Sequence, residues 1–224
     1  MITVHHLENS RSQRVLWLLE ELGVQYRVKR YARDPETQLA PASLHKVHPL
    51  GKSPVITDDG LTVAESGAII EYLLERYGQD SGLLPAPGTP ERLSYTYWLH
   101  YAEGSAMPPL LLSLIFRKMP QQPMPFFVRP VVRGIAAKVR SSYVEPQLEL
   151  HLDFMESELG KSQWFAGEAF TAADIQLSFP LEAAGAAGLL GETRPRLQAF
   201  IERVKERPAY QRALKKGGPY DLGF

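Results

Sequence analysis

Residues 51–72 read GKSPVITDDGLTVAESGAIIEY, and this stretch decides the fold of the first part of the chain. Residues 55–57 and 61–63 are short runs rich in β-branched side chains, which favour strands. Between them, Asp59-Gly60 is a dipeptide typical of a two-residue hairpin turn with positive φ. The sequence therefore predicts two antiparallel strands joined by a tight turn.

A helix is expected directly after this hairpin. Glu65-Ser66-Gly67 precedes apolar residues at helical spacing, which predict a helix from Ser66 to about Tyr77. The first N–H groups of a helix have no partner inside it, so they attract a carboxylate. At the other end of the stretch, Pro54 cannot donate to a strand ladder, and a cis Ser53-Pro54 bond would let the Val55 backbone face an extended peptide.

The residues before this stretch predict the rest of a small α/β domain. Residues 2–7 read as a strand, and an apolar helical series follows that ends at Gly23, a natural C-cap. Residues 24–31 read as a second strand, and a short helix over 42–47 is ended by Pro49. The order β-α-β-α-β-β-α, with a right-handed first crossover, is that of a thioredoxin-like domain over residues 1–79.

The second part of the chain is expected to be all helical. Residues 80–90 contain three prolines and two glycines without periodicity, which is typical of a linker. Thr89 and Pro90 then open a helix towards residue 104, and Pro108-Pro109 should break or kink its continuation. Residues 91–224 form the predicted all-helical domain.

Further signals subdivide this helical domain. A proline-rich loop is expected over residues 120–130, and a helical pattern with a kink at Pro146 follows over 131–159. Thr171-x-x-Asp174 resembles a capping box that opens a helix to about 184. The last helices are expected over 196–206 and up to about 216.

Composition excludes several classes of function. The 224 residues contain 25 basic and 25 acidic side chains, so no net charge favours nucleic acid or an anionic membrane. No stretch is long and apolar enough to span a bilayer, and residues 1–10 do not resemble a signal peptide, so we expect a cytoplasmic protein. Without cysteine, disulfides, thiolate metal sites and cysteine nucleophiles are excluded. The histidine spacing brings no three ligands together, so we expect no metal.

The order Ser-Pro-Val, hairpin, Glu-Ser, helix resembles the glutathione-binding half of the glutathione S-transferases, in particular serine-type, bacterial or fungal cytosolic members. The matching positions are Lys52, Pro54, Val55, Glu65 and Ser66, and the resemblance extends over essentially the whole chain. In that family the proline is cis, the backbone of the next residue pairs with the cysteine of glutathione, and Glu-Ser holds the γ-glutamyl group. The resemblance also implies that Lys52 meets the glycine carboxylate.

Ser10 is the candidate catalytic residue. It lies between the first strand and the first helix, where the sulfur of glutathione arrives in the resembled fold. Ser10 and Gln13 also fit a capping box, so the serine could simply cap the helix. The family's serine-type pattern has proline two residues after the serine, whereas this chain has Ser12, which leaves Asn9 or Ser12 as substitutes. A tyrosine-type mechanism is disfavoured because no tyrosine precedes Tyr26.

The resemblance further implies that the first helix of the second domain lines a site for an apolar co-substrate. The candidate residues for this electrophile site are Tyr97, Tyr101, Met107 and Phe126. An aromatic stripe at helical spacing is also typical of a helix that packs into a core.

We therefore expect an enzyme that joins glutathione to small hydrophobic electrophiles in detoxification, with a possible glutathione-dependent peroxidase activity and no cofactor beyond glutathione as co-substrate. The alternative is a non-catalytic module of the same fold that binds glutathione or apolar ligands. The resemblance also implies a homodimer in which Glu103 reaches the γ-glutamyl amine of a glutathione bound to the neighbouring chain.

Overall fold

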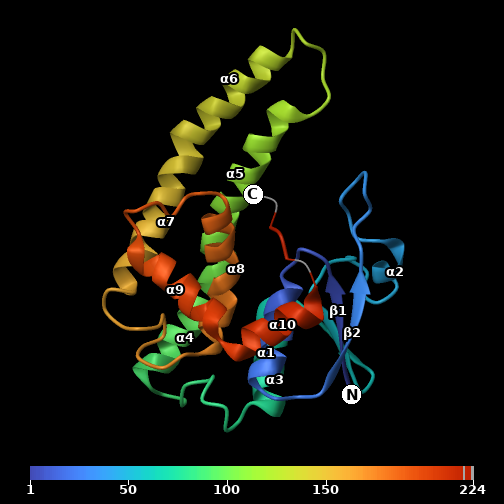
Figure 1. Ribbon diagram of the computed structural model, residues 1–224, viewed down its shortest axis with the longest axis vertical. Helices are drawn as coiled ribbons and strands as arrows, with labels where there is room; N and C mark the ends of the chain where they lie inside the picture. Colours follow the sequence, from blue (N-terminus) through green and yellow to red (C-terminus); the bar gives the residue numbers. More distant parts are fainter. Residues whose placement is uncertain (219, 223–224) are drawn as a thin grey trace.

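The structure, a computed structural model, describes residues 1–218 and 220–222 and contains a four-stranded mixed sheet beside a bundle of helices (Figure 1). The strands are β1 (Ile2–Leu7), β2 (Tyr26–Tyr31), β3 (Val55–Asp58) and β4 (Leu61–Ala64), in the order β2-β1-β3-β4. β1 and β2 are parallel, and β3 is antiparallel to both of its neighbours. The predicted hairpin and thioredoxin-like strand order are confirmed.

Three helices complete this α/β part: α1 (Ser12–Glu21), α2 (Ala42–His45) and α3 (Ser66–Tyr77). α1 and α3 pack against each other, while α2 contacts the sheet through Leu44, which is buried with Leu7 and Tyr31. β2 begins two residues later than we expected. The backbone N–H of Val24 donates to the Leu19 carbonyl at 3.2 Å, so it completes the end of α1 instead of entering the sheet.

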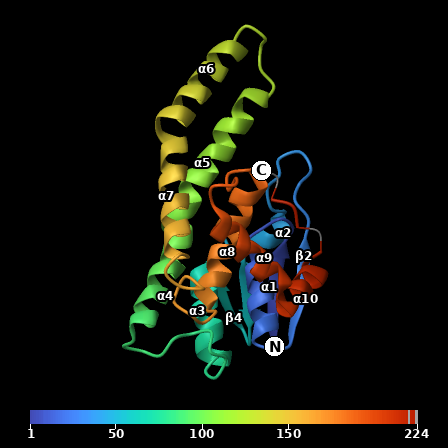
Figure 2. The same cartoon turned by 60° about the vertical axis from the view of Figure 1, so that its left-hand side comes forward.

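The remaining helices form the predicted all-helical part. They are α4 (Pro90–Tyr101), α5 (Met107–Lys118), α6 (Arg129–Val139), α7 (Glu145–Glu158), α8 (Ala172–Ala186), α9 (Pro195–Glu206) and α10 (Pro208–Gly217). α8 is buried along nearly its whole length, and both views show α5 and α6 extending beyond the rest of the molecule (Figures 1 and 2). The chain runs through turns and bends over residues 78–89; our division into residues 1–79, 80–90 and 91–224 stays a prediction.

The prolines of the helical part are accommodated differently from our expectation. α5 continues through Pro108-Pro109 to Lys118, and a π-helical turn, Ala102–Ala106, directly precedes it. A second π-helical turn, Arg140–Val144, directly precedes Pro146 in the same way. A proline lacks an N–H and its ring needs room in the preceding turn, which the wider π turn provides.

Asp174 forms the predicted capping box at the start of α8. Its carboxylate accepts hydrogen bonds from the backbone N–H and the hydroxyl of Thr171 at 2.8 and 3.1 Å, and from the backbone N–H of Phe165 at 3.0 Å. Burial raises the pKa of Asp174 to about 6, although these three donors act in the opposite direction. The motif therefore ties the loop before α8 to the first turn of that helix.

Several contacts fix the α/β part on the helices. α1 packs against α8 and α10, and Glu21 at its end pairs with the guanidinium of Arg207 at 2.6 Å. After α10, the hydroxyl of Tyr220 donates to Glu182 of α8 at 3.0 Å. Within the described part of the chain, no helix is long and apolar enough to cross a membrane.

Candidate functional site

Two adjoining pockets lie where the α/β part meets the helices. The first, here called the hairpin pocket, has a volume of about 260 Å³ and is lined by Arg11, His48, Leu50, Lys52, Ser53, Pro54, Ala64, Glu65, Ser66 and Glu103. The second, here called the domain cleft, has a volume of about 530 Å³. Its walls include Asn9, Ser10, Met107, Leu111, Phe179 and Leu222. Arg11, Lys52 and Ser53 line both, so the two pockets adjoin each other.

The hairpin pocket brings together four of the five predicted glutathione-binding residues. The Ser53-Pro54 peptide is cis, as expected, and places Pro54 on the pocket wall beside Lys52. Val55 is fully buried in β3 and is not one of the lining residues. The role predicted for Val55 uses its backbone, so it does not require the Val55 side chain to line the pocket, and it stays a prediction.

Glu65 and Ser66 occupy the start of α3, where the sequence placed them. Glu65 has a φ of 73°, which is unusual for a residue other than glycine and costs about 1–3 kcal/mol of backbone strain. Ser66 is the first residue of α3, and this residue is 4% exposed. Strain of this kind gathers at binding sites, and the sequence carried no signal for it.

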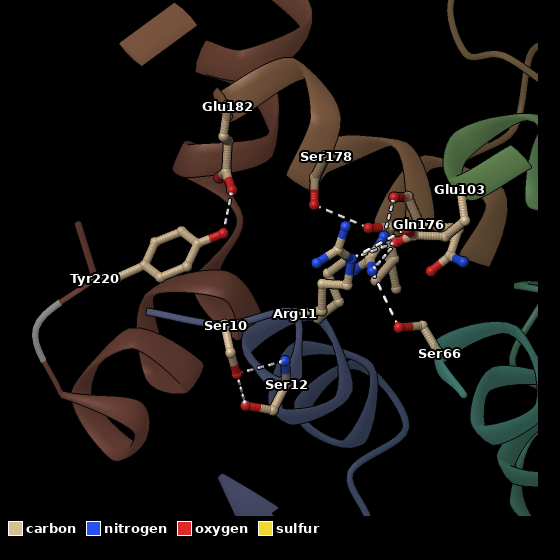
Figure 3. Close-up of polar contacts among 11 residues, drawn as sticks. Ser10, Arg11, Ser12, Ser66, Glu103, Gln176, Ser178, Glu182 and Tyr220 are labelled. Carbon is tan, nitrogen blue, oxygen red and sulfur yellow. Dashed lines mark hydrogen bonds and ion pairs between the residues drawn. The ribbon is translucent and has the colours of Figure 1, made fainter. Parts of the chain in front are cut away.

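A buried arginine supports this wall of the hairpin pocket, and Figure 3 labels its partners Ser66, Glu103 and Gln176. The guanidinium of Arg14, 1% exposed, donates from Nη2 to the Ser66 hydroxyl at 3.1 Å and to Glu103 at 2.5 Å. Its Nη1 donates to the carbonyl of Gln176 in α8 at 2.6 Å. One side chain therefore connects α1, α3, α8 and the π turn that carries Glu103.

Glu103 is held by a second arginine as well. Arg11 Nε lies 3.0 Å from each carboxylate oxygen of Glu103. Burial raises the pKa of Glu103, but Arg14 and Arg11 outweigh this effect and keep that pKa below its ordinary value. Glu103 thus lies as a carboxylate in the hairpin pocket of its own chain; its predicted contact with a neighbouring chain's ligand stays a prediction.

Ser10 lies at the beginning of α1 and lines the domain cleft (Figure 3). Its Oγ is 2.7 Å from the carbonyl of Leu7 and 2.7 Å from Ser12 Oγ, and it accepts from the backbone N–H of Ser12 at 3.3 Å. The Ser10–Gln13 capping box does not form, because the Gln13 N–H donates to the Ser10 carbonyl instead of the side chain. The serine hydroxyl belongs to a polar cluster, not to a standard helix cap.

The two substitutes considered for Ser10 lie in different surroundings. Ser12 is fully buried, and its Oγ is 2.8 Å from His6 Nδ1, so it has no access to a ligand. Asn9 is exposed, has a φ of 49° and lines the domain cleft. Its side-chain oxygen accepts from the backbone N–H of Asp221 at 2.8 Å, which holds the C-terminal segment against the cleft.

Of the four candidates for the electrophile site, Met107 is the one that lines the domain cleft with Ser10. Tyr101 is directed towards α7, where its hydroxyl lies 2.5 Å from His151 Nδ1, and Tyr97 packs against Tyr101. Phe126 is 83% exposed in the loop before α6. These three side chains are not among the residues that line the cleft.

The sequence reasoning missed other apolar residues of the cleft. Leu111 and Leu114 of α5, Phe179 of α8 and Leu222 near the C-terminus line it. Phe179 also contacts the guanidinium groups of Arg11 and Arg14, 4.9 and 5.1 Å from its ring centre. Polar side chains beside an apolar wall suit a polar nucleophile and an apolar reaction partner.

In the part of the chain described here, no group of three or more His, Asp or Glu side chains is placed to hold a metal ion. The polar groups of the two pockets include hydroxyl, guanidinium and carboxylate groups.

Comparisons with known proteins point to one family. Residues 1–75 match the model of the glutathione S-transferase N-terminal domain, and residues 122–208 match that of the C-terminal domain. Glutathione S-transferase 3 of Schizosaccharomyces pombe is 38% identical over 216 residues, covering 96% of this chain and 88% of the relative. Glutathione S-transferase 1 of Saccharomyces cerevisiae is 32% identical over 232 residues, covering 100% and 98%.

Solved structures agree with these sequence relatives. A glutathione S-transferase from Actinobacillus pleuropneumoniae superposes with a TM-score of 0.82 at 34% identity, over 99% of this chain and 95% of that one. A sphingomonad glutathione S-transferase, solved in complex with glutathione, superposes with a TM-score of 0.73 at 25% identity, over 96% and 98%.

Proposed function

This chain belongs to the glutathione S-transferase family, and we propose that it conjugates glutathione to small hydrophobic electrophiles. Members of the family are transferases that use glutathione as co-substrate and need no further cofactor. The position of the hairpin pocket directly beside the domain cleft supports the proposal most directly. A tripeptide held by Lys52 and Ser66 in the first space carries its thiol towards Ser10 in the second.

The glutathione groups are assigned by charge. The γ-glutamyl carboxylate meets Ser66 and the unpaired N–H groups at the start of α3, which favour an anion. Glu65 accepts from the γ-glutamyl amine, and the glycine carboxylate meets Lys52. The cysteine backbone of glutathione pairs with the Val55 backbone beyond the cis Pro54. The sphingomonad relative was solved in complex with glutathione, which supports glutathione as the ligand of this chain.

The thiol must ionise before it attacks. A free thiol has a pKa of about 8.5, and lowering it by ~2 units requires ~2.7 kcal/mol of preference for the thiolate. A hydrogen bond to a charged group contributes roughly 1.5–3 kcal/mol, and a helix N-terminus about 0.3–1. We assign the hydroxyl bond to Ser10, with α1 supplying the helix terminus.

The electrophile binds against the apolar wall of the domain cleft, where Met107, Leu111 and Phe179 exclude water from the reacting atoms. Holding both reactants there converts a bimolecular encounter into a local one. The thiolate forms a sulfur–carbon bond. In a substitution the leaving group departs with the electron pair of its own bond, and in an addition the displaced electron pair stays on the electrophile. Tyr97, Tyr101 and Phe126 stay further candidates for contact with larger electrophiles.

The proposal includes a cytoplasmic homodimer with a role in detoxification, as the family resemblance implies, and a glutathione-dependent peroxidase activity as a second reaction of the same thiolate. The alternative, a non-catalytic module that binds glutathione or apolar ligands, is disfavoured by the opening of Ser10 onto the cleft.

A paired measurement tests the proposal. Glutathione is titrated into the protein by calorimetry, and the same preparation is assayed with glutathione and an activated aromatic halide. Binding with turnover supports the transferase, and binding without turnover on this or a peroxide substrate supports the non-catalytic alternative. No binding of glutathione would refute both.

A further inference from the structure

A chain of three side chains leads away from the domain cleft into the α/β core. Ser10 Oγ lies 2.7 Å from Ser12 Oγ, and Ser12 Oγ lies 2.8 Å from Nδ1 of His6. His6 in β1 is 3% exposed, and Ser12 is fully buried. The Ser10 end of this chain lines the domain cleft.

The far side of the His6 ring lies near the end of α10. The backbone of Gly217 there acts to raise the pKa of His6. Gly217 can approach this closely because it has no Cβ, which would lie 2.4 Å from Gln13 Oε1 and 3.4 Å from His6 Cε1. The tautomer of neutral His6 that carries its proton on Nε2, towards this backbone, offers Nδ1 to Ser12 as an acceptor.

Counting hydrogens along the chain has a consequence for Ser10. With neutral His6, the Ser12 hydroxyl donates to Nδ1, so at the Ser10–Ser12 contact Ser10 must be the donor. The single hydrogen of Ser10 is then shared between Ser12 and the Leu7 carbonyl, both 2.7 Å away. None is left for a thiolate in the cleft unless the Ser10–Ser12 contact becomes a repulsion between lone pairs.

We propose that His6 and Ser12 are positioning residues that form a proton relay, through which the thiol proton of glutathione passes by way of Ser10 to His6. The inference rests on the proposed function of this site. The S–H bond breaks as its proton goes to Ser10, the Ser10 proton goes to Ser12, and the Ser12 proton forms a new N–H bond at Nδ1. One proton leaves sulfur and one reaches His6, and each hydroxyl is restored.

The relay reverses the direction of every hydrogen bond in the chain. His6 then carries a proton on both ring nitrogens, towards Ser12 and towards the Gly217 backbone, and Ser12 donates to Ser10. The Ser10 hydrogen is then no longer shared with Ser12, and it can turn from the Leu7 carbonyl to the thiolate. This arrangement explains why a fully buried serine stands between Ser10 and a histidine.

The charges around His6 suit a temporary acceptor. Burial lowers the pKa of His6, and Arg30 of the neighbouring strand β2 acts in the same direction, whereas the Gly217 backbone and Glu8 raise it. α1 presents the uncharged Ser12 and Gln13 to it, and α10 presents its backbone. These effects together lower the pKa of His6 and keep it neutral without ligand, and the negative charge of a thiolate in the cleft would act to raise that pKa.

The test counts protons on the unmodified protein. Glutathione is added near neutral pH while the thiolate is followed by its ultraviolet absorbance and released protons by calorimetry in two buffers of different ionisation heat. The relay predicts nearly no proton released per thiolate formed. Release of about one proton per thiolate would overturn it. A lack of glutathione binding or of thiolate would instead refute the proposed function, and the relay with it.

Histidine labelled with ¹⁵N gives an independent readout. Glutathione should convert the His6 ring from one protonated nitrogen to two, and S-methylglutathione, which has no thiol proton, should not. A His6 ring that stays neutral while thiolate forms would contradict the relay.

Variants separate the relay from a merely structural role. His6→Asn and Ser12→Ala should release about one proton per thiolate and raise the pKa of bound glutathione. The matched control is His5→Asn, since His5 is equally buried in β1 but contacts Tyr31 and Thr57. A control that changes the proton count as much as His6→Asn would contradict the assignment.

Discussion

Replacing Arg14 by methionine should destabilise the protein strongly and specifically. The guanidinium is 1% exposed and donates to Ser66, Glu103 and the Gln176 carbonyl. Methionine retains much of the side chain's volume but none of its donors. Ser66 and the Gln176 carbonyl would be left buried without this partner, and Glu103 would keep only Arg11.

The magnitude follows from burial. Removing one member of a buried, hydrogen-bonded ion pair costs about 3–5 kcal/mol, because the remaining polar groups stay desolvated. Arg11→Met is the matched control: its side chain pairs with the same carboxylate but is 35% exposed, so its loss should cost about 0–1 kcal/mol. We expect Arg14→Met to exceed Arg11→Met by at least about 2 kcal/mol.

Urea unfolding at one fixed protein concentration measures both changes, because any dimer makes apparent stability depend on concentration. A double-mutant cycle of Arg14→Met with Glu103→Gln should show a coupling free energy of about 0.5–3 kcal/mol. Equal losses for the two arginines, or a loss below about 1 kcal/mol for Arg14→Met, would refute the reasoning. Such a result would mean that the free-energy cost of burying the Arg14 guanidinium already cancels the stabilisation from its hydrogen bonds.

Three further predictions concern pH, catalysis and assembly. The folded pKa of Asp174, about 6, lies above its ordinary value, so its stabilisation is complete at low pH and is lost as pH rises through 6. Relative to Asp174→Asn, the unfolding free energy should fall by about 2 kcal/mol from pH 4 to 7, and a flat difference would contradict this. Ser10→Ala should raise the pKa of bound glutathione by about one to two units, seen in the ultraviolet titration of the thiolate, with little change in binding; a curve unmoved in Ser10→Ala but moved in Asn9→Ala would shift the catalytic assignment to Asn9. Light scattering at micromolar concentration should show a dimer, and a particle of 25.1 kDa would exclude it.

The elements that local signals specify could be predicted from the sequence. The Asp59-Gly60 turn, the start of α3 at Ser66 and the Asp174 capping box each depend on residues within a few positions of one another. Their hydrogen bonds are short in sequence, so residue type and spacing suffice. The family resemblance then supplied the cis Ser53-Pro54 bond, which is confirmed.

Interactions between distant residues could not be predicted in this way. Arg14 meets Glu103 across 89 positions and the Gln176 carbonyl across 162, and nothing in the local pattern of α1 separates a buried arginine from a surface one. Phe179 lies on α8, which is buried on nearly all sides, so no periodic pattern of apolar residues shows that this side chain lines the cleft. Tyr101 faces α7 because of helix packing that its own helix does not encode.

Calorimetric titration of glutathione into the wild type and Ser66→Ala tests the central claim, that the hairpin pocket binds glutathione at the start of α3. The matched control is Ser178→Ala, because Ser178 is also a buried helical serine, with its hydroxyl donating to the Ile175 carbonyl at 2.8 Å. Loss of a hydrogen bond to a carboxylate predicts an affinity about 10- to 150-fold weaker for Ser66→Ala and unchanged for Ser178→Ala. Equal affinities in the wild type and Ser66→Ala would contradict the account.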